Sequence, residues 1–135
     1  MIQPLWNADP VVWHWLKMTS GQHIEPATCM LMGVVKDDDI IGAVLYHRFR
    51  WPDIEMGIYT TDKSWCTRNI LKSMFSYPFF QLGCARVTAV TDPSKPEVCK
   101  FIERLGFVRE GRLRNALPHG DQIIFGMTRD ECRWI

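Results

Sequence analysis

Two neighbouring segments of the chain are apolar at most positions, and this feature most narrows the folds that the chain can adopt. Residues 29–36 and 40–50 have the lengths and residue types of β-strands, and Asp37-Asp38-Asp39 between them is typical of a turn. A strand with one side in solvent alternates apolar and polar residues, whereas a strand covered on both sides does not. We therefore predict a β-hairpin inside a sheet that carries helices on both faces.

The remaining segments extend this prediction to an α/β (α+β) fold. Asp9-Pro10 is typical of a helix start, with Asp9 as the N-cap, and Ser20-Gly21 is typical of a helix end. A connecting stretch should then run through Pro26. The order of helices and strands along the chain fits a mixed central sheet with helices on both faces. The other expected elements are a strand at 54–60, a helix at 63–82 that Pro78 kinks or ends, a strand at 85–91, a helix at 96–105 closed by Gly106, and strands at 107–110 and 122–127.

Length and composition predict a single domain that covers residues 1–135. A chain of 135 residues with 47% hydrophobic residues is large and apolar enough to bury one core. A net charge of +1 without a basic stripe gives no support for a nucleic-acid partner. The chain starts without a signal-peptide pattern, and no window approaches the ~18 apolar residues of a membrane span. We expect a cytoplasmic protein with no membrane partner.

The cysteines and histidines give no sign of a disulfide framework or a metal site. The five cysteines are odd in number and scattered, and none has CxxC spacing. Reduced thiols are the expected state of such a set. His14, His23 and His119 are too widely spaced in the sequence to suggest metal ligands.

Several short motifs lie between about residue 55 and residue 131. The most specific is Leu-Gly-Phe at 105–107 followed by Glu-Gly-Arg-Leu-Arg at 110–114, and the others are 77–83, 86–90, 92–93, 101–104, Asp121 and 123–127. Together these motifs resemble the GNAT superfamily of acyl-CoA-dependent N-acetyltransferases. The first half is similar by pattern only. Within the superfamily the chain looks most like the branch of ribosomal-protein N-terminal acetyltransferases, and its length is similar to that of small GNAT-like proteins of tailed phages.

The resemblance implies acetyl-CoA as cofactor, bound in a V-shaped gap between two parallel strands. These strands would be residues 54–60 and 85–91, and the pyrophosphate would lie on backbone N–H groups at the start of the following helix. The family's loop reads Arg/Gln-x-x-Gly-x-Gly/Ala; in that register Lys63 takes the first position, while Cys66 and Arg68 replace the glycines. The residues that the resemblance assigns to the cofactor are Ile58, Tyr59, Thr60, Lys63, Trp65, Cys66, Thr67, Arg68 and Lys95.

The same positions also allow a simpler interpretation. Lys63 and Arg68 could compensate for the glycines by charge, or they could be two solvated cations at an ordinary helix start. Lys95 stands where the family often has Asn, and Ile102 stands where it often has the Tyr that protonates the leaving thiolate. The general acid therefore stays unassigned, or water supplies the proton. Cys66 at a helix start could be acidified, although an unreactive thiol is the expected state.

Glu55 and His47 are the candidate general bases. On an extended strand Glu55, Gly57 and Tyr59 point to one face, so the Glu55 carboxylate could face the gap. His47 lies on the neighbouring strand, and imidazole exchanges protons readily at neutral pH. A surface carboxylate and a half-buried sheet residue are the alternatives for the two positions.

The acceptor is expected to be an amine on a protein or a small molecule. Deprotonating a lysine amine at pH 7 costs roughly 4.6 kcal/mol, whereas an α-amine costs about 1 kcal/mol. A site without a strong base therefore suits an α-amine. His119 and Asp121, in the last turn, are possible residues of an acceptor pocket.

Two hypotheses from different classes remain. The first is an N-acetyltransferase that moves an acetyl group directly from acetyl-CoA to an amine. The second is a GNAT-fold binding or structural protein that has lost catalysis, with a phage virion or host-modulating role, and it is favoured by the missing glycines and by Ile102. A homo-oligomer or an assembly partner is compatible with either.

Overall fold

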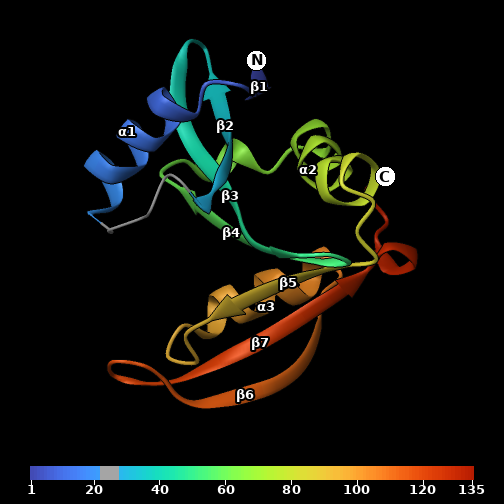
Figure 1. Cartoon of the computed structure of the whole chain (residues 1–135). Helices are drawn as coiled ribbons and strands as arrows, with labels where there is room; N and C mark the ends of the chain where they lie inside the picture. The colour runs from blue at the N-terminus through green and yellow to red at the C-terminus, as the bar shows by residue number, and fades with distance from the viewer. Residues whose placement is uncertain (22–27) are drawn as a thin grey trace.

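The computed structural model describes residues 1–21 and 28–135 and contains one seven-stranded mixed sheet in the order β1-β2-β3-β4-β5-β7-β6 (Figure 1). All neighbouring strands are antiparallel except β4 and β5, which are parallel. The strands are β1 (Ile2–Leu5), β2 (Met30–Lys36), β3 (Asp39–Arg50), β4 (Asp53–Thr60), β5 (Arg86–Thr91), β6 (Val108–Leu117) and β7 (Gly120–Thr128). The helices are α1 (Asp9–Ser20), α2 (Arg68–Ser76) and α3 (Pro96–Leu105), with the shorter η2 (Lys63–Trp65), η3 (Tyr77–Gln81) and η4 (Arg129–Glu131).

Helices cover both faces of the sheet, as the sequence predicted. On one face α1 packs Val12 and Leu16 against Leu31 of β2 and Ala43 of β3. The larger core lies on the opposite face, where α2 and α3 contribute side chains. Because β2 and β3 are buried from both sides, they need apolar residues at successive positions. The α+β fold class is confirmed.

The N-terminal strand β1 was missing from the sequence prediction. Residues Ile2–Leu5 pair antiparallel with β2, and the Met1 ammonium lies 2.7 Å from a carboxylate oxygen of Asp37. Four residues carry too little periodicity to reveal a strand, and the partner that stabilises it is about 30 residues away along the chain. The predicted order therefore lacked its first element.

The long helix predicted at 63–82 is wrong, because the segment forms three pieces. The 3₁₀ helix η2 ends at Trp65, and α2 begins at Arg68. Thr67 starts the new helix as an N-cap, with its Oγ1 accepting a hydrogen bond from the Ile70 N–H at 3.2 Å. The regular helix ends at Ser76, and Pro78 lies in the π-helical turn η3, as a proline that interrupts regular helical bonding should.

Other element ends were close to the prediction, except at the last hairpin and at Asp9. The hairpin at 29–50 and the helix that Gly106 closes are confirmed, with Gly106 in a left-handed conformation at φ 115°. The last two strands form a longer hairpin than predicted, β6 reaching Leu117 and β7 starting at Gly120. Asp9 is the first helical residue rather than the N-cap, and its carboxylate accepts a hydrogen bond from the Leu31 N–H at 3.3 Å. Most of the predicted connection through Pro26 lies outside the described residues.

We predict that Gly33→Ala destabilises the packing of α1 on β2. A Cβ built at Gly33 would lie 2.9 Å from Cγ2 of Val12, which is fully buried and β-branched, and 3.3 Å from Leu5 Cβ. Overpacking of this kind costs about 1–3 kcal/mol in free energy of unfolding, which urea denaturation measures. The matched control is Gly57→Ala, where a Cβ meets no atom of residues 1–21 and 28–135 within 4 Å, and its unfolding free energy should change little. Equal losses in both variants would contradict this packing.

Candidate functional site

The parallel strands β4 and β5 part after only three paired positions. Their register joins Asp53 to Arg86, Ile54 to Val87 and Glu55 to Thr88, and stops there although both strands continue. In Figure 1 the two strands start side by side and then diverge. Residues 56–60 of β4 pair only with β3, and residues 89–91 of β5 pair only with β7. The diverging edges of both strands therefore carry backbone N–H and C=O groups with no strand partner.

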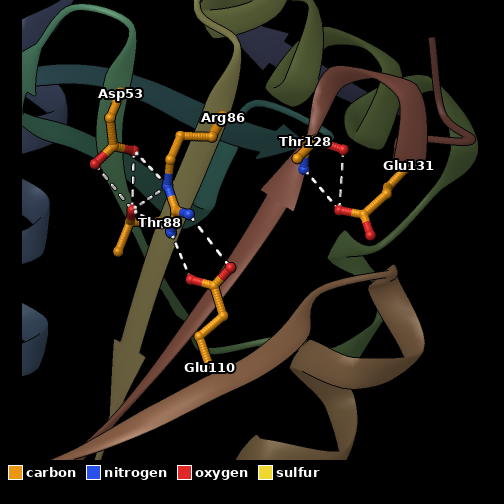
Figure 2. Close-up of polar contacts among 6 residues, drawn as sticks. All are labelled: Asp53, Arg86, Thr88, Glu110, Thr128 and Glu131. Atoms are coloured by element: carbon orange, nitrogen blue, oxygen red, sulfur yellow. Dashed lines mark hydrogen bonds and ion pairs between the residues drawn. The ribbon is translucent and has the colours of Figure 1, made fainter.

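A polar cluster centred on Arg86 ties the strands together where they are still paired (Figure 2). The Arg86 Nε lies 3.3 Å from an Asp53 oxygen, and its Nη2 donates to Thr88 Oγ1 at 3.0 Å. The Thr88 hydroxyl in turn donates to the Asp53 carboxylate at 2.8 Å. On its other side the Arg86 guanidinium donates to both oxygens of Glu110, at 2.9 and 3.3 Å. This cluster joins β4, β5 and β6 across the surface of β7.

Gly126 leaves the space in which the Arg86 and Glu110 side chains meet above β7. A Cβ at this position would lie 2.6 Å from Arg86 Nη2 and 2.6 Å from both carboxylate oxygens of Glu110. The ion pair therefore sits directly on the backbone of β7. Sequence reasoning assigned no role to Arg86, Glu110 or Gly126, although all three fall in segments that resemble the GNAT family.

The two candidate bases lie together at the last paired position of the parallel ladder. Glu55 is opposite His47 across β3 and β4, and His47 Nε2 lies 3.0 Å from Glu55 Oε2. A guanidinium nitrogen of Arg48 lies 3.5 Å from the other carboxylate oxygen. Burial alone would raise the pKa of Glu55, but the hydrogen bond from His47 and the charges of His47 and Arg48 outweigh it, so the pKa lies below its ordinary value of 4.5. Glu55 is therefore a carboxylate at neutral pH.

The Glu55 side chain lies on the face of the sheet opposite α2 and α3. Its neighbours Ile54 and Met56 are buried in the core beneath those helices, so alternation turns Glu55 to the other side. Tyr59 points the same way, because its hydroxyl donates to the Thr19 carbonyl of α1 at 3.1 Å. Between them Gly57 faces open space, since a Cβ there meets no atom of the described residues within 4 Å. The expected common face of Glu55, Gly57 and Tyr59 is present.

In the loop after β4, the side chains of Trp65 and Cys66 lie against the larger core. Trp65 is buried with its ring 5.9 Å from that of Phe101 on α3. Cys66 is half-buried against the same core, and burial raises the pKa of its thiol. The thiol is therefore not acidified by the helix start. The loop is held at its beginning by Asp62, which accepts from the Ser64 N–H at 2.8 Å.

The first two residues of α2 keep free backbone donors. The Ile70 N–H is used by the Thr67 cap, but no hydrogen-bond partner is found among the described residues for the N–H groups of Arg68 and Asn69. The Arg68 guanidinium lies 5.9 Å from the centre of the Trp134 ring, and Cys66 packs against the core.

The remaining predicted cofactor residues lie around the diverging strands. Ile58 and Thr60 are partly buried on the part of β4 that does not pair with β5. Lys63 is exposed at the start of η2, and Lys95 is exposed before α3. Ile102 packs against the larger core.

His119 and Asp121 do not form a pair. His119 Nε2 lies 2.5 Å from a carboxylate oxygen of Asp92 at the end of β5, which also accepts from the Ser94 N–H. The hydrogen bonds from Ser94 and His119 hold the pKa of Asp92 at about 2. Asp121 instead accepts from Arg112 at 3.1 Å within the β6–β7 hairpin.

All five cysteines are free thiols. Within residues 1–21 and 28–135, no group of three His, Cys, Asp or Glu side chains is placed to hold a metal ion. None of the helices described in these ranges has the length and hydropathy of a membrane span.

Comparison with known proteins decides the family. The sequence model of the acetyltransferase (GNAT) domain matches residues 3–108, which is more than half of the chain and includes its N-terminal part. The chain belongs to the GNAT acetyltransferase family. A search of curated proteins gives no match for this GNAT domain.

Solved structures show the same GNAT fold at low identity. A mutant form of the spermidine/spermine N-acetyltransferase of Vibrio cholerae superimposes with a TM-score of 0.79 at 12% identity, covering 96% of each chain. The ribosomal-protein-S5-alanine acetyltransferase of Vibrio fischeri gives 0.71 at 18% identity, over 98% of this chain and 94% of that one. A dodecameric spermidine N-acetyltransferase of V. cholerae gives 0.79 at 12% identity, over 96% and 94%.

We predict that Gly126→Ala disrupts the Arg86–Glu110 ion pair. The added methyl group would occupy the space of both side chains and lower the free energy of unfolding by about 1–3 kcal/mol. Chemical denaturation of a double-mutant cycle with Glu110→Ala measures the effect, and the cost should be smaller once the Glu110 carboxylate is removed. Gly111→Ala is the matched control on the adjacent strand, because its Cβ would meet only Ile124 at 3.6 Å. A cost independent of Glu110 would contradict the assignment.

Proposed function

We propose that this protein is an N-acetyltransferase that moves an acetyl group from acetyl-CoA to an amine. The observation that carries the proposal is the Glu55–His47 pair at the last rung of the β4–β5 ladder, beside the open position at Gly57. The pair lies next to strand edges whose backbone groups are free to bind an extended ligand. A structural strand junction alone does not require a paired, partly buried carboxylate and imidazole at this point.

The residues around the diverging strands fit the cofactor. The unpaired backbone of Ile58–Thr60 can hydrogen-bond the amides of the pantetheine arm, as a strand would. The free N–H groups of Arg68 and Asn69 suit its pyrophosphate. The buried Trp65 and the N-cap Thr67 fix the conformation of the loop before α2. Lys63 at the start of η2 and Lys95 before α3 add exposed positive charge. The bound cofactor supplies an acetyl thioester, which an amine can attack once it has lost its proton.

His47 and Glu55 have different roles in the proposed proton transfer. Because the pKa of Glu55 is lowered, its carboxylate is a weak base and acts mainly by orienting His47 and attracting a cationic acceptor. His47 then accepts the proton from the acceptor amine, and the neighbouring carboxylate stabilises the imidazolium that forms. With Ile102 in the core, water is the donor to the departing thiolate.

An α-amine is the favoured acceptor. One carboxylate and one imidazole offer no strong base, and an α-amine costs about 1 kcal/mol to deprotonate at pH 7 against roughly 4.6 for a lysine. Two structural neighbours are named for acetylation of ribosomal-protein-S5 alanine and of spermidine, and both names support an amine acceptor. The lower cost of deprotonating an α-amine favours that kind of acceptor.

A second candidate is a GNAT-fold binding or structural protein without catalysis. Cys66 and Arg68 in place of the loop glycines, and Ile102 in place of the usual tyrosine, are the observations that favour it.

We predict that the protein binds acetyl-CoA and that Cys66→Gly leaves the affinity unchanged or improves it. The Cys66 side chain packs toward the core, so its removal should not disturb the loop's free N–H groups. Isothermal titration calorimetry and thermal shift measure the binding. Absence of binding at millimolar acetyl-CoA in both proteins would instead establish the noncatalytic alternative.

We predict that His47→Asn lowers kcat by about 10²–10⁴-fold, the usual contribution of a general base. Glu55 stays ionised above about pH 6 because its pKa is lowered, so its own protonation should contribute no change of kcat above that pH in either protein. Steady-state kinetics with an N-terminal peptide acceptor measures both. The control is His14→Asn, a change at an exposed position of α1. An unaltered kcat in His47→Asn would exclude His47 as the base.

A further inference from the structure

Arg133 and Trp134, near the end of the sequence, pack on the C-terminal end of α3. Trp134 Nε1 donates to the Leu105 carbonyl at 2.9 Å, and a guanidinium nitrogen of Arg133 donates to the Arg104 carbonyl. Arg133 also lies over the Trp134 ring, 4.5 Å from its centre. These bonds satisfy carbonyl groups that a helix end leaves free, and they fix the indole ring in place.

A second cationic side chain, from α2, lies near the Trp134 ring. Arg68 is the first residue of α2, and its guanidinium lies 5.9 Å from the centre of the Trp134 ring. Its side chain is exposed, and no carboxylate of the described residues lies within ion-pair distance of it. Attraction between the guanidinium and the face of the indole is thus the contact that orients it.

We propose that Arg68, held by Trp134, binds the 3′-phosphate of coenzyme A. The inference rests on the proposed function, because it assumes that the pyrophosphate lies at the start of α2. The ribose of coenzyme A carries the pyrophosphate on one carbon and the 3′-phosphate on another, so a cation one side chain away from the first group can reach the second. Arginine binds phosphate through two parallel N–H bonds. A side-chain contact at position 68 thereby adds to the backbone contact that a glycine would give.

Trp134 acts as a positioning residue in this arrangement. A free arginine side chain loses about 2 kcal/mol of rotamer entropy when it is immobilised. The ring restricts the guanidinium before any ligand arrives, so less of that entropy remains to be lost on binding. Arg133 on the same ring already donates to Arg104 and caps α3, which leaves Arg68 as the group available to phosphate.

Calorimetric titration of the full chain with coenzyme A and with 3′-dephospho-coenzyme A tests the proposal. The wild-type protein should bind coenzyme A about tenfold or more tightly than the dephospho form, as expected for a charge-assisted hydrogen bond. Arg68→Ala should weaken coenzyme A by that factor, leave the dephospho form unchanged and so abolish the preference. Trp134→Leu keeps apolar bulk without an aromatic face and should reduce the preference, whereas Trp134→Phe should retain most of it. Arg114→Ala, an exposed arginine on β6, is the control and should bind like wild type.

The outcomes separate this inference from the proposed function. If coenzyme A binds but Arg68→Ala keeps the full preference for the 3′-phosphate, the assignment of Arg68 is overturned. If wild type binds both ligands equally, the site for the 3′-phosphate is absent. If the protein binds neither, the proposed function fails and this inference fails with it. Thermal melting of each variant shows whether a loss of affinity reflects a loss of fold.

Discussion

The structure depends on a parallel ladder of only three rungs between β4 and β5, locked by the guanidinium of Arg86. Arg86 contacts the carboxylates of Asp53 and Glu110 and the hydroxyl of Thr88, and so joins both halves of the sheet at one point. Beyond that point the strands diverge, while each stays paired on its other side, β4 with β3 and β5 with β7. The free strand edges exist only because the ladder is held at one end and open at the other.

The candidate site follows from the position of this junction. Glu55 is the last residue of β4 that pairs with β5, and the antiparallel register of β3 brings His47 to it. Their side chains share the face opposite α2 and α3, where Gly57 leaves room. The two side chains that we propose for proton transfer thereby lie beside the strand edge that we propose for the cofactor. The alternation of a strand and the register of two ladders together produce the arrangement.

The loop after β4 lacks the glycines of the motif that it resembles, and contacts with other parts of the chain shape it. The helix predicted as continuous is broken at Cys66 and Thr67, which lets Trp65 enter the core beside Phe101 and lets Thr67 cap α2. The Arg68 guanidinium lies instead near Trp134 at the end of α3. Of the two side chains that replace glycine, Cys66 thus packs against the core, and Arg68 stays exposed beside the Trp134 ring. Sequence alone could not reveal this, because it depends on contacts with residues more than 30 positions away.

The sequence by itself determined the elements with strong local patterns: the doubly covered hairpin, the helix ended by Gly106, and the common face of Glu55, Gly57 and Tyr59. Local periodicity suffices there, because burial and alternation act over a few residues. Only the tertiary structure decided the strand β1, the break in the long helix, the full length of the last hairpin, and the partners of Glu55, Arg68 and Arg86. The strand β1, the burial of Trp65 beside Phe101 and the partners of Arg68 and Arg86 depend on groups distant in sequence, which leave no periodic signal in the chain. The partners of Glu55 and the length of the last hairpin depend on the pairing register of neighbouring strands, which local periodicity does not specify either.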